Sequence, residues 1–516
     1  MRTAKSLVRG SIFRTADLAL LLGATFWITP LIVHSLGERM YGVWTLIGVF
    51  MGYYGLLDFG LSSAAARYLS QALGKGSMEE VNRVASTTYF LFCTIGAAAL
   101  LLTGACIAAC PLVVHDPADL VLFRKILVLL GVATALGFPI RVYEGIMTAH
   151  LRYDSLAYIS ISRTILSNTA IYFALRAGGR IMSVAVISFS VSLLDYAATY
   201  AVCARQHREI DVRILNFDRV KMRAMFDHSW KTFLTAISDI LRFRIDSVVI
   251  AAFLGVSLVT PYAIGVRLID GFGKLVNSSI GMMQPVFSRY DGSGDYDAIR
   301  GALLKATKLS ALMCAFIGFS ILFYGKALIR RWMGPGFDGS YYVSAILCVA
   351  FMIELPQSPG IQLLYGLSKH ESYAALNGVE AVLNVIFSIA LLKKFGMYGV
   401  VLGTALEVAL IKIFVLPRFI CACVGMPVKT FLIDTIFVTI AKAAVPLALF
   451  FFLIKPILQP DYLRLAECGA LQTLFFVPVV YFFILTGEER FLIGKVAASF
   501  FEKAGPKKAE GVNAAV

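Results

Sequence analysis

The feature that most constrains this chain is a series of fourteen apolar segments, each of about 20 residues. A helix of that length crosses the hydrocarbon core of a bilayer. The strands of a transmembrane barrel alternate polar and apolar residues at every second position, and these segments do not. We therefore predict an all-α polytopic membrane protein. The predicted spans are 14–36, 42–66, 84–109, 126–148, 155–175, 181–203, 228–254, 261–287, 307–325, 341–366, 373–392, 397–417, 431–454 and 465–486.

Composition agrees, because 59% of the residues are hydrophobic and only 15% are charged, which excludes an ordinary soluble domain. The net charge of +15 could suggest a nucleic-acid partner. The predicted spans, however, contain about as many basic as acidic residues, so the positive excess lies in the loops. There we expect it to set the topology and to contact anionic membrane lipids, and we expect no nucleic-acid partner.

The arginines and lysines of the loops predict the orientation of the chain. If the N-terminus lies inside, the inner segments hold 26 of these residues and the outer segments hold 12. Because cytoplasmic loops carry the excess of positive residues, we expect both termini in the cytoplasm. The first apolar run is long enough to span, and no small-residue cleavage site follows it. We therefore expect an uncleaved first helix and not a signal peptide.

Motifs for enzyme chemistry are missing from the sequence. It contains no GxxxxGK[ST] phosphate loop, no HExxH metal motif and no GxSxG nucleophile motif. The nine cysteines are scattered, without a CxxC pair or zinc-type spacing. We therefore expect a non-enzymatic protein with no cofactor and no metal site.

The two halves of the chain show a duplication. Tyr41 and Tyr262 lie in similar contexts and are 221 residues apart, and the ARY and SRY triplets around Arg67 and Arg289 are 222 apart. NTAIYFAL from Asn168 parallels NVIFSIAL from Asn384, at an offset of 216. Six spans per half would insert both copies the same way up. The predicted domains are a six-helix lobe at 1–204, a basic cytoplasmic linker at 205–226, a six-helix lobe at 227–424, an extra helix pair at 425–499 and a disordered tail at 500–516.

Two stretches show a family resemblance. YGVWTLIGVFMGYYGLLDFGLSSAAARYLSQALGKG (41–76) and RIDSVVIAAFLGVSLVTPYAIGVRLI (244–269) resemble the polysaccharide transporter family. These proteins are oligosaccharide-lipid flippases of the multidrug/oligosaccharidyl-lipid/polysaccharide exporter superfamily. The resemblance implies a V-shaped pair of lobes around a cavity that opens alternately to each side of the bacterial inner membrane.

The implied cargo is an undecaprenyl-diphosphate-linked sugar repeat unit for O-antigen, capsule or exopolysaccharide. Lipid II is a less favoured cargo. The family resemblance implies that lipid II flippases have arginines deep in the first helix, whereas the first helix here has only Arg14 and Asp17 at one end and His34 at the other. The resemblance leaves open a polysaccharide polymerase and export machinery as partners. In the family, cationic residues of the cavity are thought to hold the diphosphate.

Charges within the spans supply the candidate residues, because a charge at bilayer depth usually faces a cavity or a partner. In 261–287 polar residues recur every three or four positions, which predicts one polar face on that helix. We assign the cationic cavity to Arg242, Arg244, Arg267, Lys274 and Arg163. The polar cavity lining is predicted as Asn277, Gln284, Asn377, Glu380 and Asn384. Ion coupling by a proton or sodium is assigned to Asp246, Glu354 and Asp270, and a gate to Asp58, Arg67 and Arg289.

Each assignment has a competing explanation. The cations could merely neutralise nearby acids: Asp270 lies within one turn of both Arg267 and Lys274, and Arg141 is expected to pair with Glu144. Buried amides and hydroxyls also join helices without binding any cargo. At the level of function, a cation-coupled drug exporter of the same scaffold and a membrane glycan polymerase or ligase remain alternatives.

Overall fold

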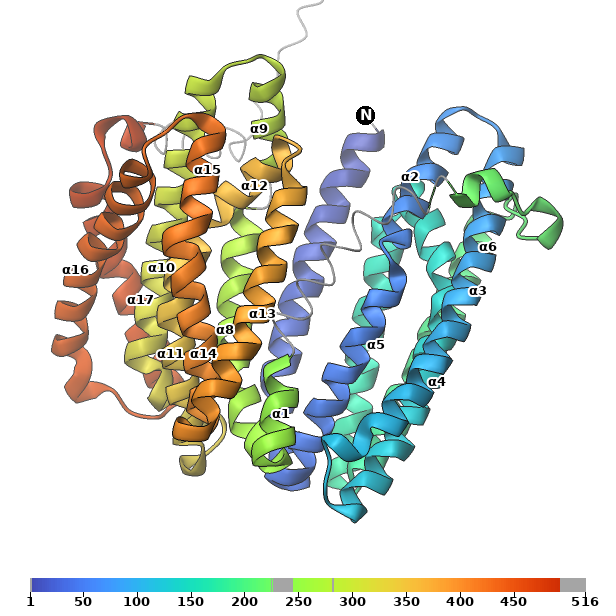
Figure 1. The fold of residues 1–516 in the computed structure, drawn as a ribbon, viewed down its shortest axis with the longest axis horizontal. Helices are drawn as coiled ribbons and strands as arrows, with labels where there is room; N and C mark the ends of the chain where they lie inside the picture. The colour runs from blue at the N-terminus through green and yellow to red at the C-terminus, as the bar shows by residue number, and fades with distance from the viewer. Residues whose placement is uncertain (1, 224, 226–244, 281–282, 492–516) are drawn as a thin grey trace, which may run out of the picture.

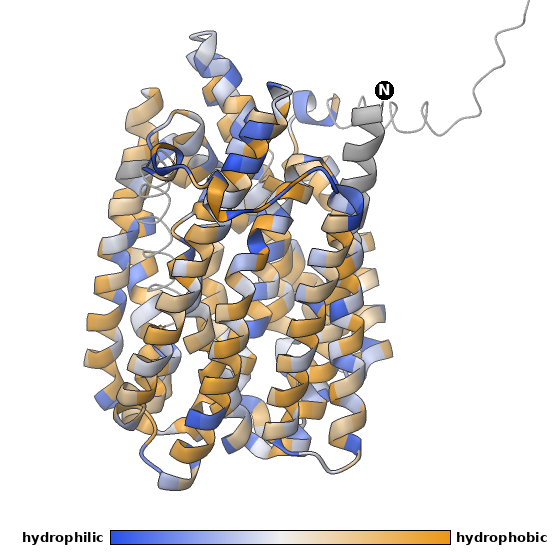
Figure 2. Cartoon of the chain, turned by 90° about the vertical axis from the view of Figure 1, so that its right-hand side faces the viewer, coloured by the Kyte–Doolittle hydropathy of each residue, from blue (hydrophilic) through white to orange (hydrophobic). Residues whose placement is uncertain are grey.

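The computed structural model describes residues 2–223, 225, 245–280 and 283–491. Within these ranges the chain is helical and contains no strand. Ten of the described helices are long and apolar enough to cross a membrane. Figure 2 shows hydrophobic residues along most of their length. The predicted all-α polytopic fold is confirmed. The described part of each predicted span is helical over most of its length; the seventh span is described only from Ile245 onward, and the eighth without residues 281–282.

The first group of helices begins with one long element. It comprises α1 (Arg2–Tyr53), α2 (Leu61–Gly74), α3 (Met78–Ala109), α4 (Pro117–Ala149), α5 (Tyr153–Arg176) and α6 (Ile181–Gln206). Helix α1 includes the first predicted span and about half of the second, and the two are divided at Gly37, whose backbone (φ 79°, ψ 163°) is not helical. A residue with a side chain would rarely adopt this φ, which explains the glycine at the turn.

The second group comprises the remaining helices. They are Ile245–Leu254, α8 (Val259–Ile280), α9 (Met283–Gly292), α10 (Tyr296–Trp332), α11 (Asp338–Glu354), α12 (Ser358–Gly366), α13 (His370–Phe395), α14 (Met397–Leu410), α15 (Leu416–Val424), α16 (Val438–Ile454) and α17 (Tyr462–Val479). A π-helical segment, Ile411–Val415, joins α14 to α15. The same geometry occurs over Lys429–Phe437 and Val480–Ile484.

The two groups form lobes that diverge toward the end of the molecule where the N-terminus lies (Figure 1). They meet at the opposite end, where the Thr260 hydroxyl donates to the Glu38 carbonyl (2.5 Å). Gly42 approaches Val256 so closely there that a Cβ at Gly42 would lie 2.2 Å from the Val256 carbonyl oxygen. The chain is therefore closed at this end by backbone contact between the lobes.

Backbone angles repeat at corresponding positions of the two halves. Gly37 has φ 79° and ψ 163°, and Gly255 has φ 96° and ψ 158°. Leu151 and Ser368, in the corresponding loops before α5 and α13, have φ 57° and 58°. Non-glycine residues with positive φ are uncommon, so this agreement supports a common origin of the lobes. The exact domain boundaries stay a prediction.

Helices α16 and α17 pack against the outside of the second lobe. The Lys308 Nζ of α10 contacts the Glu489 Oε2 at 2.6 Å, and Gln472 donates to Ser320 Oγ at 2.7 Å. Phe316 and Phe476 stack with ring centroids 5.4 Å apart. The start of α17 also reaches α1, where the rings of Tyr462 and Phe26 meet edge to face with centroids 6.3 Å apart.

Candidate functional site

Helix α8 has one apolar and one polar face. Phe272, Val276 and Ile280 are buried, whereas Asp270 and Lys274 are exposed. Helices α1 and α8 are in contact, and Arg267, Asp270 and Lys274 of α8 line one cavity together with residues of α1. The predicted polar stripe therefore lies on an open surface between these helices. Asn277 and, on α9, Gln284 are also exposed, and Asn277 Oδ1 accepts from the Ser358 hydroxyl of α12 at 3.0 Å.

Two cavities adjoin this stripe and share Arg267 and Asp270 in their walls. The first, of ≈ 430 Å³, is also lined by Asp246, Tyr262 and Thr404. The second, of ≈ 770 Å³, lies between α1 and α8 and includes Lys274. Two cations and one carboxylate line this second cavity, so its wall carries a net positive charge.

Arg267 also joins α8 to α1. Its Nη1 donates to the hydroxyl of Thr29 at 2.7 Å, and the guanidinium lies 5.9 Å from the ring centroid of Tyr41. Arg267 is partly exposed, so the guanidinium retains an open side toward the cavities. A guanidinium has five N–H donors, so the single hydrogen bond to Thr29 leaves several N–H groups that could bind an anion.

Asp246 forms the centre of a buried oxygen cluster in the wall of the first cavity. Its residue surface is 3% exposed, and its Oδ2 accepts from the Tyr262 hydroxyl (2.9 Å) and from Thr404 Oγ1 (2.8 Å). Asn384 Nδ2 donates to the same Thr404 hydroxyl at 2.9 Å, and Ser388 donates to the Val400 carbonyl at 3.3 Å. Within the described residues, the Oδ1 of Asp246 and the Oδ1 of Asn384 have no hydrogen-bond partner.

The second polar stripe, on α13, does not line a cavity as predicted. Asn377, Glu380 and Asn384 are fully buried in the second lobe. Glu380 Oε1 lies 2.5 Å from the Nζ of Lys412, on the π-helical segment after α14, and both side chains are 0% exposed. The stripe has the expected spacing, but its polar groups are turned toward α14 and not toward open space.

Arg163 lies in a separate place from the cations of α8. Its Nη1 is 3.9 Å from Asp195 Oδ2 on α6, and both residues line a cavity of ≈ 240 Å³ in the first lobe. Arg163 does not line either cavity of α8. The structure therefore favours the competing explanation for Arg163, a pair with an acid on another helix.

One further ion pair differs from the sequence analysis. Arg141 forms its ion pair with Asp58 (Nη1 to Oδ1, 2.7 Å) and not with Glu144. Asp58 also accepts from the Ser62 hydroxyl at 2.5 Å, so its contacts hold α2 and α4 together within the first lobe. These partners give no support to the predicted gate role of Asp58.

The remaining candidates are distributed as follows. Arg67 on α2 and Arg289 on α9 are exposed on elements that lie on opposite lobes toward the diverging end (Figure 1). Glu354 is buried at the end of α11 and lines neither cavity of α8. Arg242 and Arg244 lie outside the described residues.

Sequence reasoning missed the oxygen groups around Asp246. Thr404 and Tyr262 are common residue types in helices, and nothing in their local spacing marks them, whereas Ser388 lies four residues after Asn384 on the predicted stripe. Only the internal duplication could have suggested that spans seven, eleven and twelve approach one another. The structure shows that these helices converge on one carboxylate.

Comparison with known proteins agrees with this architecture. The family described as polysaccharide biosynthesis protein matches residues 15–291, more than half of the chain. A protein of Shigella flexneri that carries the name of an O-antigen transporter is 21% identical over 390 residues, which cover 73% of this chain and 89% of that protein.

Two solved structures show the same fold. The lipid II flippase MurJ, in an inward closed conformation, has a TM-score of 0.69 and 14% identity, and the match covers 92% of this chain and 99% of MurJ. A multidrug resistance MATE family transporter of the MOP superfamily, in an inward-facing conformation, has a TM-score of 0.66 and 16% identity over 81% of this chain and 98% of that one. The chain belongs to the polysaccharide biosynthesis protein family.

Proposed function

We propose that the protein moves undecaprenyl-diphosphate-linked oligosaccharide repeat units from the cytoplasmic to the outer leaflet of a bacterial inner membrane. The observation that carries this proposal is the basic wall of the ≈ 770 Å³ cavity between α1 and α8, with Arg267 and Lys274 around one acid, Asp270. The name of the Shigella flexneri relative supports a glycan cargo.

The chemistry of the cargo explains the basic wall. A diphosphate brings about two negative charges and many acceptor oxygens, which lose water when the headgroup enters a membrane protein. Arg267 can offer a planar fork of donors, and Lys274 a compact charge. One charge-assisted hydrogen bond contributes about 1.5–3 kcal/mol, so each cation would strengthen binding roughly ten- to 100-fold. The apolar residues Leu21, Leu22 and Leu275 of the same cavity would suit a lipid chain.

Alternating access is proposed from the closure of one end. The contacts of Glu38 with Thr260 and of Gly42 with Val256 close the end opposite the N-terminus. If both termini are cytoplasmic, as the distribution of arginine and lysine indicates, the structure is the inward-facing state. Export would then require these contacts to separate while the lobes approach each other at the other end.

The Asp246 cluster is the proposed coupling site for a cation. Hard cations such as sodium are bound by carboxylate, amide, hydroxyl and carbonyl oxygens, and such oxygens converge here from three helices and α8. An isolated buried carboxylate is costly, so this site favours either a proton on Asp246 or a bound cation. Binding of either would couple an ion gradient to movement of the second lobe.

The test is restoration of surface polysaccharide in a strain that lacks the gene. The wild-type protein should restore the glycan, whereas Arg267→Ala and Lys274→Ala should restore less and should accumulate lipid-linked repeat units inside. Lys442→Ala is the matched control, since Lys442 is an exposed cation on the apolar helix α16 and lines neither cavity.

Three outcomes would count against the proposal. Undiminished glycan export by the double variant Arg267→Ala/Lys274→Ala would show that these two cations do not bind the cargo. If the strain that lacks the gene has normal levels of lipid-linked intermediates and is sensitive to drugs, the protein would instead be a drug exporter. Translocated but unpolymerised repeat units in the null strain would favour a polymerase or ligase.

A further inference from the structure

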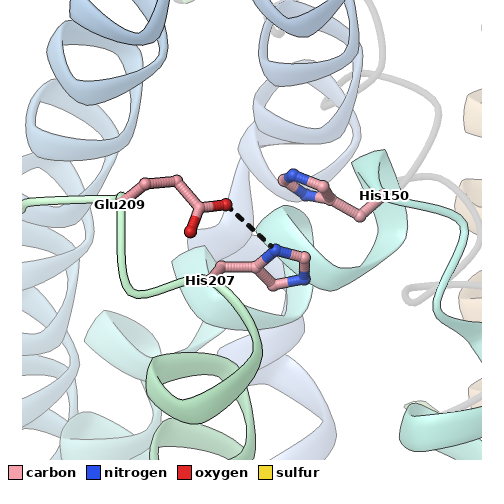
Figure 3. Close-up of side chains that lie close together, drawn as sticks. All are labelled: His150, His207 and Glu209. Carbon is pink, nitrogen blue, oxygen red and sulfur yellow. Dashed lines mark ion pairs between the residues drawn. The ribbon is translucent and has the colours of Figure 1, made fainter.

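A histidine cluster lies at the end of the first lobe, away from the cavities of α8. His150 caps the C-terminus of α4, His207 caps the C-terminus of α6, and Glu209 follows two residues later in the linker between the lobes. Figure 3 shows the three side chains turned toward one another. The imidazole centroids are 3.8 Å apart, and His207 Nδ1 lies 3.6 Å from Glu209 Oε1.

The hydrogen bond of His150 determines its tautomer. Its Nδ1 lies 2.9 Å from the Ile146 carbonyl oxygen, which can only accept, so Nδ1 carries the proton. The Nε2 of a neutral His150 is therefore a lone-pair donor. An N–H bond from the other ring nitrogen to a backbone carbonyl is the arrangement that orients metal-ligating histidines in proteins.

His207 has a ring nitrogen without a partner. Its side chain is 10% exposed, and its Nε2 is buried with no hydrogen-bond partner within the described residues. A buried polar atom that lacks a partner is costly, and a bound ion or water is one of the explanations for such an atom. Burial and the neighbouring His150 both lower the pKa of His207, which favours the neutral imidazole that a metal requires.

We propose that His150, His207 and Glu209 form a binding site for a Zn²⁺-class divalent metal. One ligand atom from each residue lies within 4.8 Å of the others. Two histidines and one glutamate are a known ligand set for zinc, with a fourth position left for water. Tetrahedral bonds of about 2.1 Å bring ligand atoms to about 3.4 Å, so the site must contract, and the exposed Glu209 can supply that movement.

The surroundings of the cluster are compatible with a cation. The charge of Arg152 also lowers the pKa of His207, but the Nε of Arg152 lies 3.5 Å from Asp154 Oδ1, so part of that charge is neutralised. The linker beyond Glu209 is held on α3, because the backbone N–H of Asp211 donates to Asn82 at 2.9 Å. A bound metal would add a second attachment and fix the start of the linker to the end of α4.

The experiment is a zinc titration of the full chain in lipid nanodiscs, in competition with a chromophoric zinc indicator. We expect one tight site per chain. His150→Ala and His207→Ala should weaken it by at least roughly ten-fold, because even second-shell partners of a metal contribute 10- to 100-fold. His115→Ala is the matched control, since His115 is exposed between α3 and α4 and should leave the tight site unchanged.

Two additional measurements distinguish the loss of a metal ligand from misfolding of a variant. Glu209→Gln changes a side chain that is 52% exposed, so it should keep the fold while it weakens zinc. Co²⁺ bound in place of zinc should give the visible absorption of a four-coordinate ion, and His207→Ala should abolish it. The proposal is overturned if the wild-type chain lacks a stoichiometric site, if both histidine variants bind as tightly as wild type, or if His115→Ala loses the same site.

Discussion

The carboxylate of Glu380 and the ammonium of Lys412 form an ion pair, with Oε1 and Nζ 2.5 Å apart, in which neither side chain has any exposed surface. Gln357 adds to this site, because its Nε2 donates to the Lys412 carbonyl at 2.8 Å. That carbonyl lies in a π-helical segment, where an i→i+5 pattern replaces the usual helical bonds. The pair thus joins α13 to the junction of α14 and α15.

Removal of one charge from this pair should destabilise the second lobe. Lys412→Met leaves the Glu380 carboxylate buried and uncompensated, which we expect to cost about 3–5 kcal/mol of unfolding free energy. The double variant Lys412→Met/Glu380→Gln should recover much of that loss, because no charge remains. The measurement is thermal unfolding of the purified protein in detergent, with Lys442→Met as the control. Equal losses in the single and double variants would contradict this role.

The indole of Trp332 compensates for a proline in α1. Pro30 has no N–H, so the carbonyl of Phe26, four residues earlier, loses its helical partner. Trp332 Nε1 donates to that carbonyl at 2.6 Å, and its ring stacks on Phe26. Trp332→Phe retains an aromatic ring but should cost about 1–3 kcal/mol for the unsatisfied carbonyl.

A double-mutant cycle checks this compensation. In a Pro30→Ala background the residue-30 N–H can bond to Phe26, so Trp332→Phe should then cost less. Unfolding of the four proteins in denaturant gives the coupling energy. A zero coupling energy would show that the indole acts only through stacking.

Gly42 should control closure of the lobes. A Cβ there would lie 2.2 Å from the Val256 carbonyl oxygen, so Gly42→Ala should separate the contact and disfavour this conformation. Spin labels at His115 and Ser257, both exposed near this end, should report longer distances in the variant. Gly104→Ala is the control, because its Cβ would meet no atom within 4 Å. An unchanged distance distribution in Gly42→Ala would exclude a conformational role for this contact.

Transport should depend on a sodium or proton gradient through Asp246. Asp246→Asn keeps the size of the side chain and removes its charge, so transport should lose its response to a sodium or proton gradient. Proteoliposomes with each gradient imposed separately will identify the ion. Glu354→Gln provides the comparison, because Glu354 lines neither cavity and should leave the response intact. A gradient response that survives in Asp246→Asn would reject the proposed coupling site.

The periodicity of the sequence predicted the helices and the polar face of α8. Within a single helix, residues three or four positions apart lie on the same face, so this part needs no knowledge of the other helices. Lys274 and Phe272 are two residues apart and lie on opposite faces, as that rule requires. Helical spacing does not predict whether a polar stripe faces a cavity or another helix. Glu380 lies in an equally regular stripe, yet it is buried because Lys412, 32 residues later, lies opposite it.

Long-range pairings were the part that the sequence could not supply. Arg141 lies one turn from Glu144, but its ion pair is with Asp58, 83 residues away. The histidine cluster was missed for a related reason. His150 and His207 are 57 positions apart, and they meet only because α4 and α6 end at the same side of the first lobe.

The most direct test of the central claim is lipid translocation by the purified protein in proteoliposomes, with a polyprenyl-diphosphate oligosaccharide as cargo. The wild-type protein should move the cargo between leaflets, and Arg267→Ala/Lys274→Ala should lose most of this activity. Thr29→Val removes the hydrogen bond between α1 and Arg267 but keeps the cation, so it should retain transport. Translocation that is equal in wild type and in the double variant, or that is lost equally in Thr29→Val, would contradict a cationic cavity that binds the diphosphate.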